Sequence, residues 1–415
     1  MKKALFSTLC ILLLTTACSN TPKSDSDHST IDIESGMNQL VEIKISDIAK
    51  EIRYVPLETK DSSLVGNKPS IRLLSDKILV TTSKQAMLFD KSTGKYICSV
   101  GHIGEDPEGY SNTTCYIGND QLLYFFRQPN QLVKYDLNGR FIDKITLLDA
   151  KGTADSPTQF GYYDISDNCI IGHNSNLMGD DPNSLIFYDQ SGVRKDSLLN
   201  QIVPLPRKSM DEINSFQVRQ GKEKYGNVKG VIMLKYKDNT QAVSFPSAPV
   251  LWKSGKETRF KELFVDTIYT VRKNRLEPYL SFKTGKWHWP IEERNLTEKN
   301  EERIFISYVV ENDRHIFFQC ILGIHTENPV LHNGIYDKTN HSTILGIGTE
   351  GIKDDLTHFA AFYPSECTPS GEYASIIDAG TALDWLDKNP QADLSKLNFL
   401  KQIDEDSNPI VIIAQ

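Results

Sequence analysis

Few residues in this sequence have the type and spacing that common enzyme classes need. None of the nine histidines belongs to an H-E-x-x-H pair, and no serine lies in a G-x-S-x-G turn, so neither a zinc protease nor a serine hydrolase of that type is predicted. His325 and His332 are seven residues apart, which a loop could bring together, but a metal role is the less favoured interpretation. Gly101, Gly104 and Gly109 could expose backbone amides to a phosphate, yet no Gly-Lys-Ser/Thr follows. A turn is the favoured interpretation.

Trp287, His288 and Trp289 form a compact aromatic group. Exposed indoles stack on sugar rings or fill hot spots at protein interfaces, whereas buried indoles pack between sheets. Core packing is favoured, but in a strand the two tryptophans would point to opposite faces, and one of them could be exposed. These three residues are therefore the candidate binding site, for a glycan or an envelope protein.

The cysteines predict neither a disulfide framework nor a zinc site. After Cys10 and Cys18 near the N-terminus, five cysteines remain, an odd number at long spacings with no C-x-x-C. Cys169 and Cys320 lie in apolar runs, where a small buried thiol is the favoured interpretation.

The N-terminus has the order of a secretory signal. Lys2 and Lys3 precede an apolar run too short to span a bilayer, and small residues lead to Cys18. The segment resembles a bacterial lipobox, in which the cysteine is lipidated and becomes the new N-terminus, and Thr15 stands where leucine is usual. It is similar to the lipobox motifs of Bacteroidota lipoproteins, which tolerate residues other than the usual ones. The alternative is an ordinary signal peptide. We expect residues 1–17 to be a signal peptide and Cys18 to be the lipidation site.

Composition and charge agree with a globular domain on a tether. Hydrophobic residues make up 39% and charged residues 24% of the chain, and the formal net charge of -8 argues against a nucleic-acid partner. Residues 18–39 begin with a polar stretch and are expected to form a flexible tether to the membrane. The predicted location is the cell envelope, anchored by lipid to the outer membrane. Asp25 and Asp27 are a weak form of a surface-export signal, so the leaflet stays open.

One hairpin pattern recurs along residues 40–415. An aspartate follows an apolar run, and a glycine three or four residues later supplies the positive φ that a tight reversal needs. Asp90, Asp136 and Asp189 are 46 and 53 residues apart, a period typical of propeller blades, and Asp337 begins a degraded copy.

These repeats predict an all-β fold, a six-bladed β-propeller with four-stranded antiparallel blades. The last blade would be closed by N- and C-terminal strands, with Val55 and Val411 in one sheet, which removes the open edge. Residues 204–229 and 284–303 are predicted excursions, and 381–388 a short helix. The blades are expected at 71–100, 121–147, 169–199, 231–282 and 304–345, and the sixth at 51–57 with 371–377 and 409–413.

Three motifs carry a resemblance to a family. Residues 54–59 (YVPLET), 100–110 (VGHIGEDPEGY) and 404–409 (DEDSNP), together with the hairpins, resemble the six-bladed β-propeller lipoproteins of Bacteroidota, an NHL-like and TolB-like group. The resemblance covers residues 40–415. It implies the fold but no activity, because most of that family has none assigned.

Six-bladed propellers that resemble calcium-dependent lactonases hold a hard cation in the channel with oxygen ligands. By this resemblance the candidate metal ligands are Asp120, Asn168 and Asp313. A role in turns is the favoured interpretation, so no cofactor is expected, and calcium belongs only to the enzyme alternative.

Three functions follow as hypotheses. The first is a lipid-anchored, extracytoplasmic propeller that binds a ligand or protein partner at one face without catalysis. The second is a metal-dependent hydrolase or lyase with its site in the channel. The third is a scaffold subunit of an envelope complex.

Overall fold

The protein is built almost entirely of β-strands. The computed structural model describes residues 30–155, 163–166, 169–174, 183–199, 208–228, 230–244, 248–293 and 301–415. Within these ranges the strands form seven sheets, of which five have four strands. An all-β fold of four-stranded antiparallel sheets is thus confirmed.

Four sheets connect consecutive strands in antiparallel order. Their strands are β3 (Ser70–Leu73), β4 (Lys77–Thr81), β5 (Ala86–Asp90) and β6 (Tyr96–Ser99); β7 (Cys115–Ile117), β8 (Leu123–Arg127), β9 (Gln131–Tyr135) and β10 (Phe141–Thr146); β11 (Tyr163–Ile165), β12 (Ile170–His173), β13 (Asn183–Tyr188) and β14 (Arg194–Leu199); and β22 (Ile304–Glu311), β23 (His315–Leu322), β24 (Val330–Asp337) and β25 (Ser342–Ile347). The first strands β7 and β11, of three residues each, lie outside the predicted blades because so short a run has no visible alternation.

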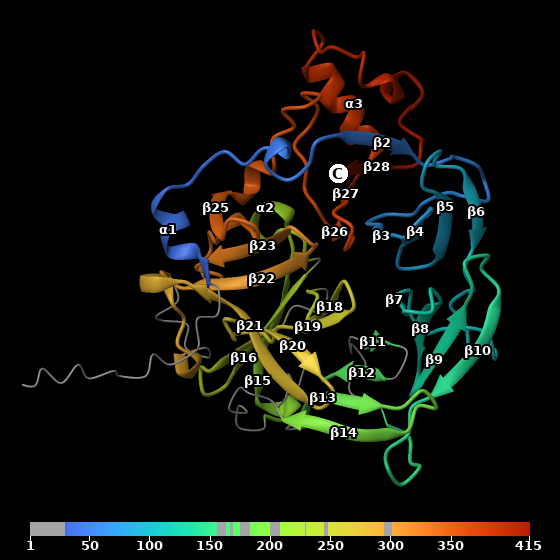
Figure 1. Ribbon diagram of the computed structural model, residues 1–415, viewed down its shortest axis with the longest axis vertical. Coiled ribbons are helices and arrows are strands. Elements are labelled where there is room, and N and C mark those ends of the chain that lie inside the picture. Colours follow the sequence, from blue (N-terminus) through green and yellow to red (C-terminus); the bar gives the residue numbers. More distant parts are fainter. Residues whose placement is uncertain are drawn as a thin grey trace, which may run out of the picture.

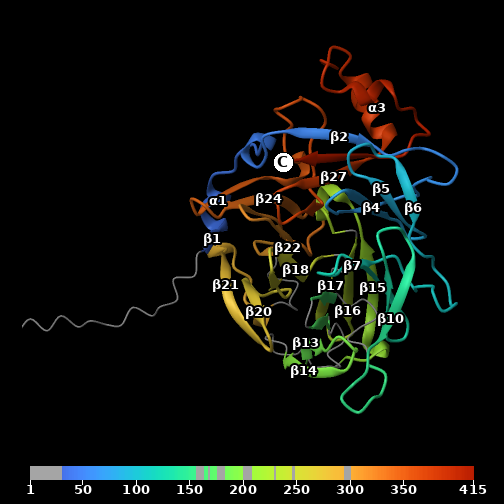
Figure 2. The same cartoon turned by 45° about the vertical axis from the view of Figure 1, so that its right-hand side comes forward.

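A fifth four-stranded sheet joins the two ends of the fold, and we call it the seam sheet. Its strands are β2 (Ile52–Pro56), β28 (Ile410–Ala414), β27 (Tyr373–Ile377) and β26 (Glu366–Cys367). β2 pairs with β28 along its whole length, with Val55 opposite Val411 as predicted, and the two strands lie side by side in Figures 1 and 2. Both valines are buried against Ile71, Val80 and Phe89 of the next sheet, so apolar packing holds the seam to the rest of the fold.

The predicted blade at 231–282 is wrong, because two sheets divide this stretch. One has three strands, β15 (Ile213–Arg219), β16 (Val231–Tyr236) and β17 (Gln241–Ser244). The other contains β18 (Leu251–Ser254), β19 (Glu257–Phe260), β20 (Thr267–Arg272) and β21 (Arg275–Lys283). Val231, Met233 and Val243 bury one face of the three-stranded sheet in the main core, which separates β16 from β18–β21. The predicted excursion at 204–229 therefore includes a strand.

Residues 30–39, which were expected to belong to the tether, are part of the described fold. Residues 30–39 of the expected tether contain β1 (Thr30–Asp32) and α1 (Ile33–Asn38). β1 pairs with β21 in parallel as a fifth strand of that sheet. Ile31 and Ile33 are completely buried, so this segment gains apolar contacts that a flexible tether would lack.

The repeated hairpins are held by local hydrogen bonds. Asp90 Oδ1 accepts from the hydroxyl groups of Ser92 and Thr93 and from the backbone N–H groups of the same two residues. These hydrogen bonds, those of the hydroxyls most of all, lower the pKa of Asp90 to about 2. In three hairpins the side chain of the residue after the aspartate donates a hydrogen bond to a backbone oxygen in the turn between the first and second strands of its own sheet. These donors are Lys91 to Leu74 O and Ser75 O, Gln190 to Ser166 O, and Lys338 to Asn312 O.

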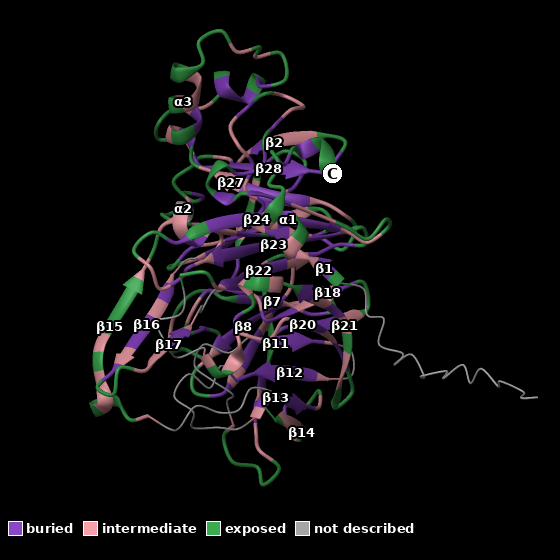
Figure 3. Ribbon diagram, turned by 90° about the vertical axis from the view of Figure 1, so that its left-hand side faces the viewer, coloured by how far each residue is buried: buried purple, intermediate pink, exposed green. Residues whose placement is uncertain are grey.

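The connections between strands fall into two classes. In an antiparallel sheet, successive connections leave opposite ends. The tight turns between first and second strands, and between third and fourth strands, lie at one end, which we call the turn face. The long connections before and after each sheet, and the one between β27 and β28, lie at the opposite end, which we call the loop face. Figure 3 shows the three-stranded sheet and α3 on the side away from the C-terminus.

Short helices occur mainly in the long connections. The helix predicted at 381–388 is confirmed as α3 (Ala379–Lys388), and its Trp385 packs on Phe359 with ring centroids 4.7 Å apart. None of the helices in the described ranges is long and apolar enough to cross a membrane. Besides α1 and α3, the described ranges contain α2 (Lys222–Tyr225) and six 3₁₀ helices. These are η1 (Ile45–Asp47), η2 (Met210–Glu212), η3 (Gly285–Trp287), η4 (Ile291–Glu293), η5 (Gly348–Glu350) and η6 (Asn398–Lys401).

The innermost strands contact one another from sheet to sheet. β7 contacts β11, β11 contacts β18, β18 contacts β22, β22 contacts β26, and β26 contacts β3. Figure 1 shows these strands near the middle of the molecule, with the sheets around them.

Candidate functional site

Two of the three candidate metal ligands, Asp120 and Asp313, lie in different turns of the described fold. Asp120 belongs to the turn between β7 and β8, where its carboxylate accepts from Tyr124 Oη (2.7 Å) and the N–H of Leu122 (3.1 Å). Asp313 is exposed in another turn, and Asn168 lies outside the described residues. Among the residues that the structure describes, no group of three His, Cys, Asp or Glu side chains could hold a metal ion. The carboxylate of Asp120 is thus engaged in its own turn, and we derive no step through a metal ion.

Charged side chains of the innermost strands pair with one another. Arg72 of β3 lies 3.2 Å from Glu366 of β26, and the Glu366 carboxylate raises the pKa of Arg72. Lys253 of β18 lies 2.9 Å from Asp164 of β11. Burial raises the pKa of Glu366, since desolvation disfavours its charged form. Both pairs link neighbouring sheets, which is a structural use of charge.

The predicted aromatic group is split by the fold. Trp289 is buried, with its ring centroid 5.2 Å from that of Phe264. Trp287 is half-buried and lies under Lys286 Nζ, 4.4 Å from the ring centroid. His288 is exposed, and its Nδ1 lies 3.1 Å from Asp266 Oδ2. The three residues follow β21 on the loop face, so one tryptophan supports the core while the segment around it reaches solvent.

A cluster of buried charges lies beneath this segment, in the connection between β19 and β20. Lys261 and Glu262 are each 6% exposed. Lys261 Nζ donates to the backbone oxygen of Glu262 (3.2 Å), and Glu262 Oε1 accepts from Ser184 Oγ (2.9 Å). Glu262 Oε2 is buried without a hydrogen-bond partner. Burying two ionisable groups side by side without a closed ion pair is costly, so this loop is a candidate functional site.

The protonation states of this cluster are strongly perturbed. Burial lowers the pKa of Lys261 to about 8 and raises the pKa of Glu262 to about 7. Burial also raises the pKa of Asp266, against the opposing effects of Lys261 and His288. Desolvation dominates in each case, because removing water disfavours the charged form of both acids and bases. Lys261 and Glu262 therefore change charge close to neutral pH.

The loop also contains an uncommon backbone conformation. Phe264 has a φ of 62°, in the left-handed region that bulky side chains rarely adopt. Its ring packs between Trp289 and Phe305, with a centroid distance of 4.9 Å to Phe305. Aromatic packing holds the residue in this conformation, and such strain is often found at functional loops.

The space inside the cluster is very small. A cavity of about 10 Å³ is bounded by Lys261, Asp266, Trp289 and the start of β22. That volume admits about one water molecule and no organic substrate. The cluster can respond to protonation or to contacts on its surface, but it cannot enclose a reactant.

A more open groove lies on another part of the molecule. It has a volume of about 190 Å³ and is bounded by residues 41–43 and by side chains from 346–361. Glu42 lies 3.0 Å from Lys353, and Asp354 accepts from Tyr54 Oη (2.8 Å) and the N–H of Leu356. These charged groups are engaged within the protein, so we place no catalytic group there.

His325 and His332 have different neighbours. His325 lies edge-on to Trp289, with centroids 5.7 Å apart, and burial lowers its pKa to about 4. His332 lies in β24 opposite Cys320, and burial lowers its pKa as well. Cys320 is fully buried as predicted, whereas Cys169 is only partly buried.

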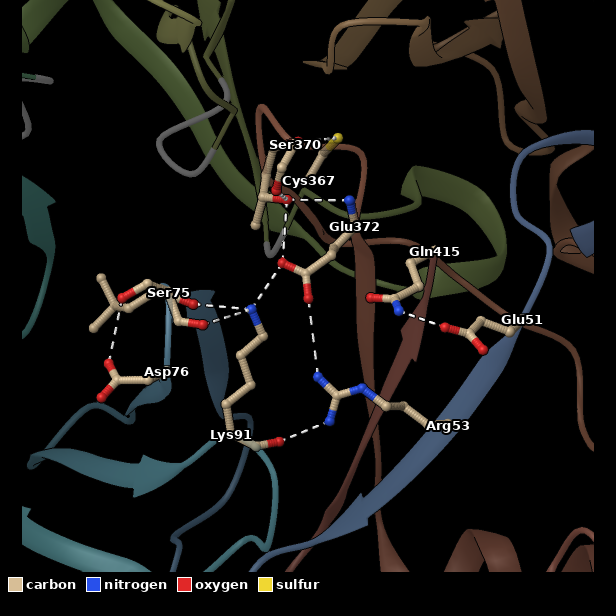
Figure 4. A network of polar contacts seen from close by, with 11 residues as sticks. Glu51, Arg53, Ser75, Asp76, Lys91, Cys367, Ser370, Glu372 and Gln415 are labelled. Atoms are coloured by element: carbon tan, nitrogen blue, oxygen red, sulfur yellow. Dashed lines mark hydrogen bonds and ion pairs between the residues drawn. The ribbon is translucent and has the colours of Figure 1, made fainter.

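A second polar network lies on the turn face, between the seam sheet and the first sheet (Figure 4). Glu372 lies 2.7 Å from Lys91 and 3.9 Å from Arg53, and Lys91 also donates to two backbone oxygens of the β3–β4 turn. Arg53 Nη1 donates to Lys91 O (2.7 Å). We call Arg53, Lys91 and Glu372 the clasp, because their side chains join the two sheets.

The sequence did not point to the loop of Lys261 and Glu262. Two adjacent charges usually mark a solvated turn, and only the apolar residues on either side, Phe260, Leu263 and Phe264, could have indicated burial. The covering residues come from other parts of the chain, which local pattern cannot reveal.

Similarity to one solved structure supports the fold. An exported protein of Bacteroides fragilis is similar over 93% of this chain and 99% of its own length, with 16% identity and a TM-score of 0.57. The extracellular domain of a hybrid two-component system protein (BT4673) of B. thetaiotaomicron has 11% identity and a TM-score of 0.34, covering 80% of this chain and 40% of that one. No curated protein matches the sequence. Residues 28–415 match DUF4934, a domain of unknown function, and the chain belongs to this family.

Proposed function

We propose that this protein is a lipid-anchored, six-bladed β-propeller of the cell envelope that binds a protein partner through its loop face and does not catalyse a reaction. In this proposal the five four-stranded sheets and the β18–β21 sheet are the blades. The three-stranded sheet is an insertion on the loop face.

The contacts between sheets support a ring. The innermost strands β3, β7, β11, β18, β22 and β26 contact one another in this order, apart from β3 and β7, whose sheets share the core of Leu79, Leu88 and Phe125. The pairing of β2 with β28 places both ends of the chain in one blade. Such a blade leaves no open edge in the ring.

The hairpin glycines support the same arrangement. A Cβ atom on Gly94 would lie 2.0 Å from Pro56 O, on Gly139 2.2 Å from Ser99 O, and on Gly192 2.2 Å from Thr146 O. Each hairpin thus packs against the outermost strand of the preceding sheet. A contact that repeats from sheet to sheet is expected of equivalent blades around one axis.

The observation that carries the binding role is the asymmetry of the two faces. The turn face has short turns with internally paired charges, whereas the loop face holds the long connections, the three-stranded sheet and the segment of Trp287 and His288. Loops on a rigid scaffold are where binding residues concentrate. The buried cluster beneath them has no room for a substrate, which favours binding over catalysis.

Site-specific photo-crosslinking tests the binding role. A photoreactive amino acid would replace His288 on the loop face or Asn138 on the turn face in intact cells. We expect a protein adduct from position 288 and none from position 138. Equal adducts from both positions would contradict a loop-face site, and metal-dependent hydrolysis of a lactone or ester panel by the purified protein would contradict a non-catalytic role.

The anchor is tested separately, because it depends on Cys18, which precedes the described residues. The exported B. fragilis protein supports a location outside the cytoplasm. We expect Cys18→Ala to abolish incorporation of labelled palmitate and to release the protein from the membrane fraction. Retention of the Cys18→Ala variant in membranes would argue for a different anchor.

A further inference from the structure

β15 is an edge strand with an exposed apolar surface. In the described ranges it pairs only with β16, so no described strand lies along its outer edge. Phe216 is 60% exposed and Val218 is 51% exposed. β15 lies at the margin of the molecule, mostly exposed, in Figure 3. Unpaired backbone groups and apolar side chains together make this edge a template for another strand.

The strand lacks the features that usually protect an edge. Natural edge strands are short or bulged outward, or carry proline or lysine. β15 has seven residues, no proline and a single charge, Arg219, at its end. Its one irregularity lies near the start, between Ile213 and Ser215, and leaves the segment from Ser215 to Arg219 regular.

The two faces of β15 differ in their surroundings. Gln217 and Arg219 are opposite Met233 and Val231, which belong to the main core, so this face turns toward the protein. Phe216 and Val218 share the other face with Leu234 and Ile232, part of a small separate apolar cluster. An added strand with apolar residues on this second face would extend that cluster.

The strand complements a second copy of itself. In an antiparallel pair about a two-fold axis through Gln217, Phe216 of one copy lies opposite Val218 of the other, on both sides of the axis. Directly opposite apolar pairs of this kind stabilise sheets. The flanking charges agree with this direction. Asp211 and Glu212 lie before the strand, and Arg219 and Lys224 lie at its end and beyond it, so antiparallel copies bring acidic and basic ends together.

We propose that two copies of this protein associate through antiparallel pairing of their β15 strands, centred on Gln217, which joins two three-stranded sheets into one of six strands. Such an interface is closed, because each copy uses the same strand once. The inference does not depend on the identity of the partner proposed above, nor on the lipid anchor.

Cysteine crosslinking of the full chain in intact cells tests the register. Across the axis the two Gln217 Cα atoms would be about 4.5–5.5 Å apart, so Gln217→Cys should form a disulfide-linked dimer. Ser215→Cys is the matched control on the same strand face. Its two copies would be about 13 Å apart at about 3.3 Å per residue, beyond disulfide reach. The unsubstituted chain controls for the natural cysteines.

The outcomes decide between the alternatives. A dimer from Gln217→Cys but not from Ser215→Cys supports the proposal. A crosslink from Phe216→Cys in its place would overturn the register, and a Gln217→Cys adduct with a different protein would identify β15 as a site for another chain.

A second measurement covers the case in which the cysteines do not react. The detergent-purified protein should sediment as a dimer, and Phe216→Lys with Val218→Lys should sediment as a monomer of unchanged circular dichroism. Both side chains are largely exposed, so the fold should tolerate the change. A monomeric unsubstituted protein at about 50 μM, above typical weak-dimer constants, would overturn the proposal.

Discussion

Glu262 shows how one residue's environment sets its chemistry. Its carboxylate is buried, one oxygen accepts from Ser184 Oγ, and the other has no hydrogen-bond partner. Burial raises its pKa from 4.5 to about 7, so the folded protein keeps this proton over a pH range in which the unfolded chain has released it. The native state therefore binds more protons between pH 4.5 and 7, and the free energy of unfolding falls as the pH rises through that window.

Glu262→Gln should remove this pH dependence. The amide oxygen can still accept from Ser184 but cannot ionise, so we expect the variant to be more stable than the parent above pH 7, by at most about 3 kcal/mol at 1.36 kcal/mol per pKa unit. Below pH 4.5 the two proteins should be equally stable. Urea unfolding at pH 4 and pH 7.5 measures the difference. Glu105→Gln, at an exposed position, is the control, and an equal gain from both variants would contradict the assignment.

The hairpin is the element that the sequence repeats, and its glycine meets two requirements. Gly94 has a φ of 72°, and a Cβ atom there would lie 2.0 Å from Pro56 O of the neighbouring sheet. Gly255 also has a positive φ, 58°, but a Cβ atom would meet nothing within 4 Å. The pair therefore separates backbone conformation from contact between sheets.

Gly94→Ala should destabilise the protein more than Gly255→Ala. The left-handed conformation alone costs about 1–2 kcal/mol in either position. At Gly94 the backbone of β2 must also move, and we expect a total loss of about 3 kcal/mol or more. Urea unfolding of the two variants provides the comparison. Losses of the same size would mean that the hairpin does not press against β2.

At the scale of the whole molecule, the clasp in Figure 4 joins the two ends of the chain to the first sheet. The side chains of Lys91 and Glu372 are only 9% and 13% exposed, and their charged atoms are 2.7 Å apart. Removing one partner of a buried pair leaves the other charge uncompensated, which costs about 3–5 kcal/mol. We therefore expect Glu372→Ala to lower the free energy of unfolding by about 3 kcal/mol, measured by urea unfolding.

A double variant isolates the role of charge. Replacing a buried ion pair by apolar residues of similar size is often neutral, so Lys91→Met with Glu372→Leu should recover most of the stability that Glu372→Ala loses. Asp387→Asn, an exposed position in α3, is a control that should change little. If the double variant is as unstable as Glu372→Ala, the clasp acts through hydrogen bonds to backbone oxygens more than through its charges.

The sequence determined those features that local chemistry controls. The hairpins of Asp90, Asp136 and Asp189 were predicted because an aspartate and a glycine a few residues apart satisfy their own turn. The pairing of Val55 with Val411 was predicted because a repeated sheet needs a partner for its last edge. Local pattern also predicted the helix near 381–388. It did not predict the strands of three residues.

Tertiary structure alone decided the rest. β16 has the same apolar pattern as the strands of the four-stranded sheets, and only its burial against the main core assigns it to a separate sheet. Lys261 and Glu262 have the composition of a surface turn, and they are buried because residues distant in sequence cover them. Which edges stay open, and which charges lose their water, depends on packing between segments far apart in the chain, and no local run of residues contains that information.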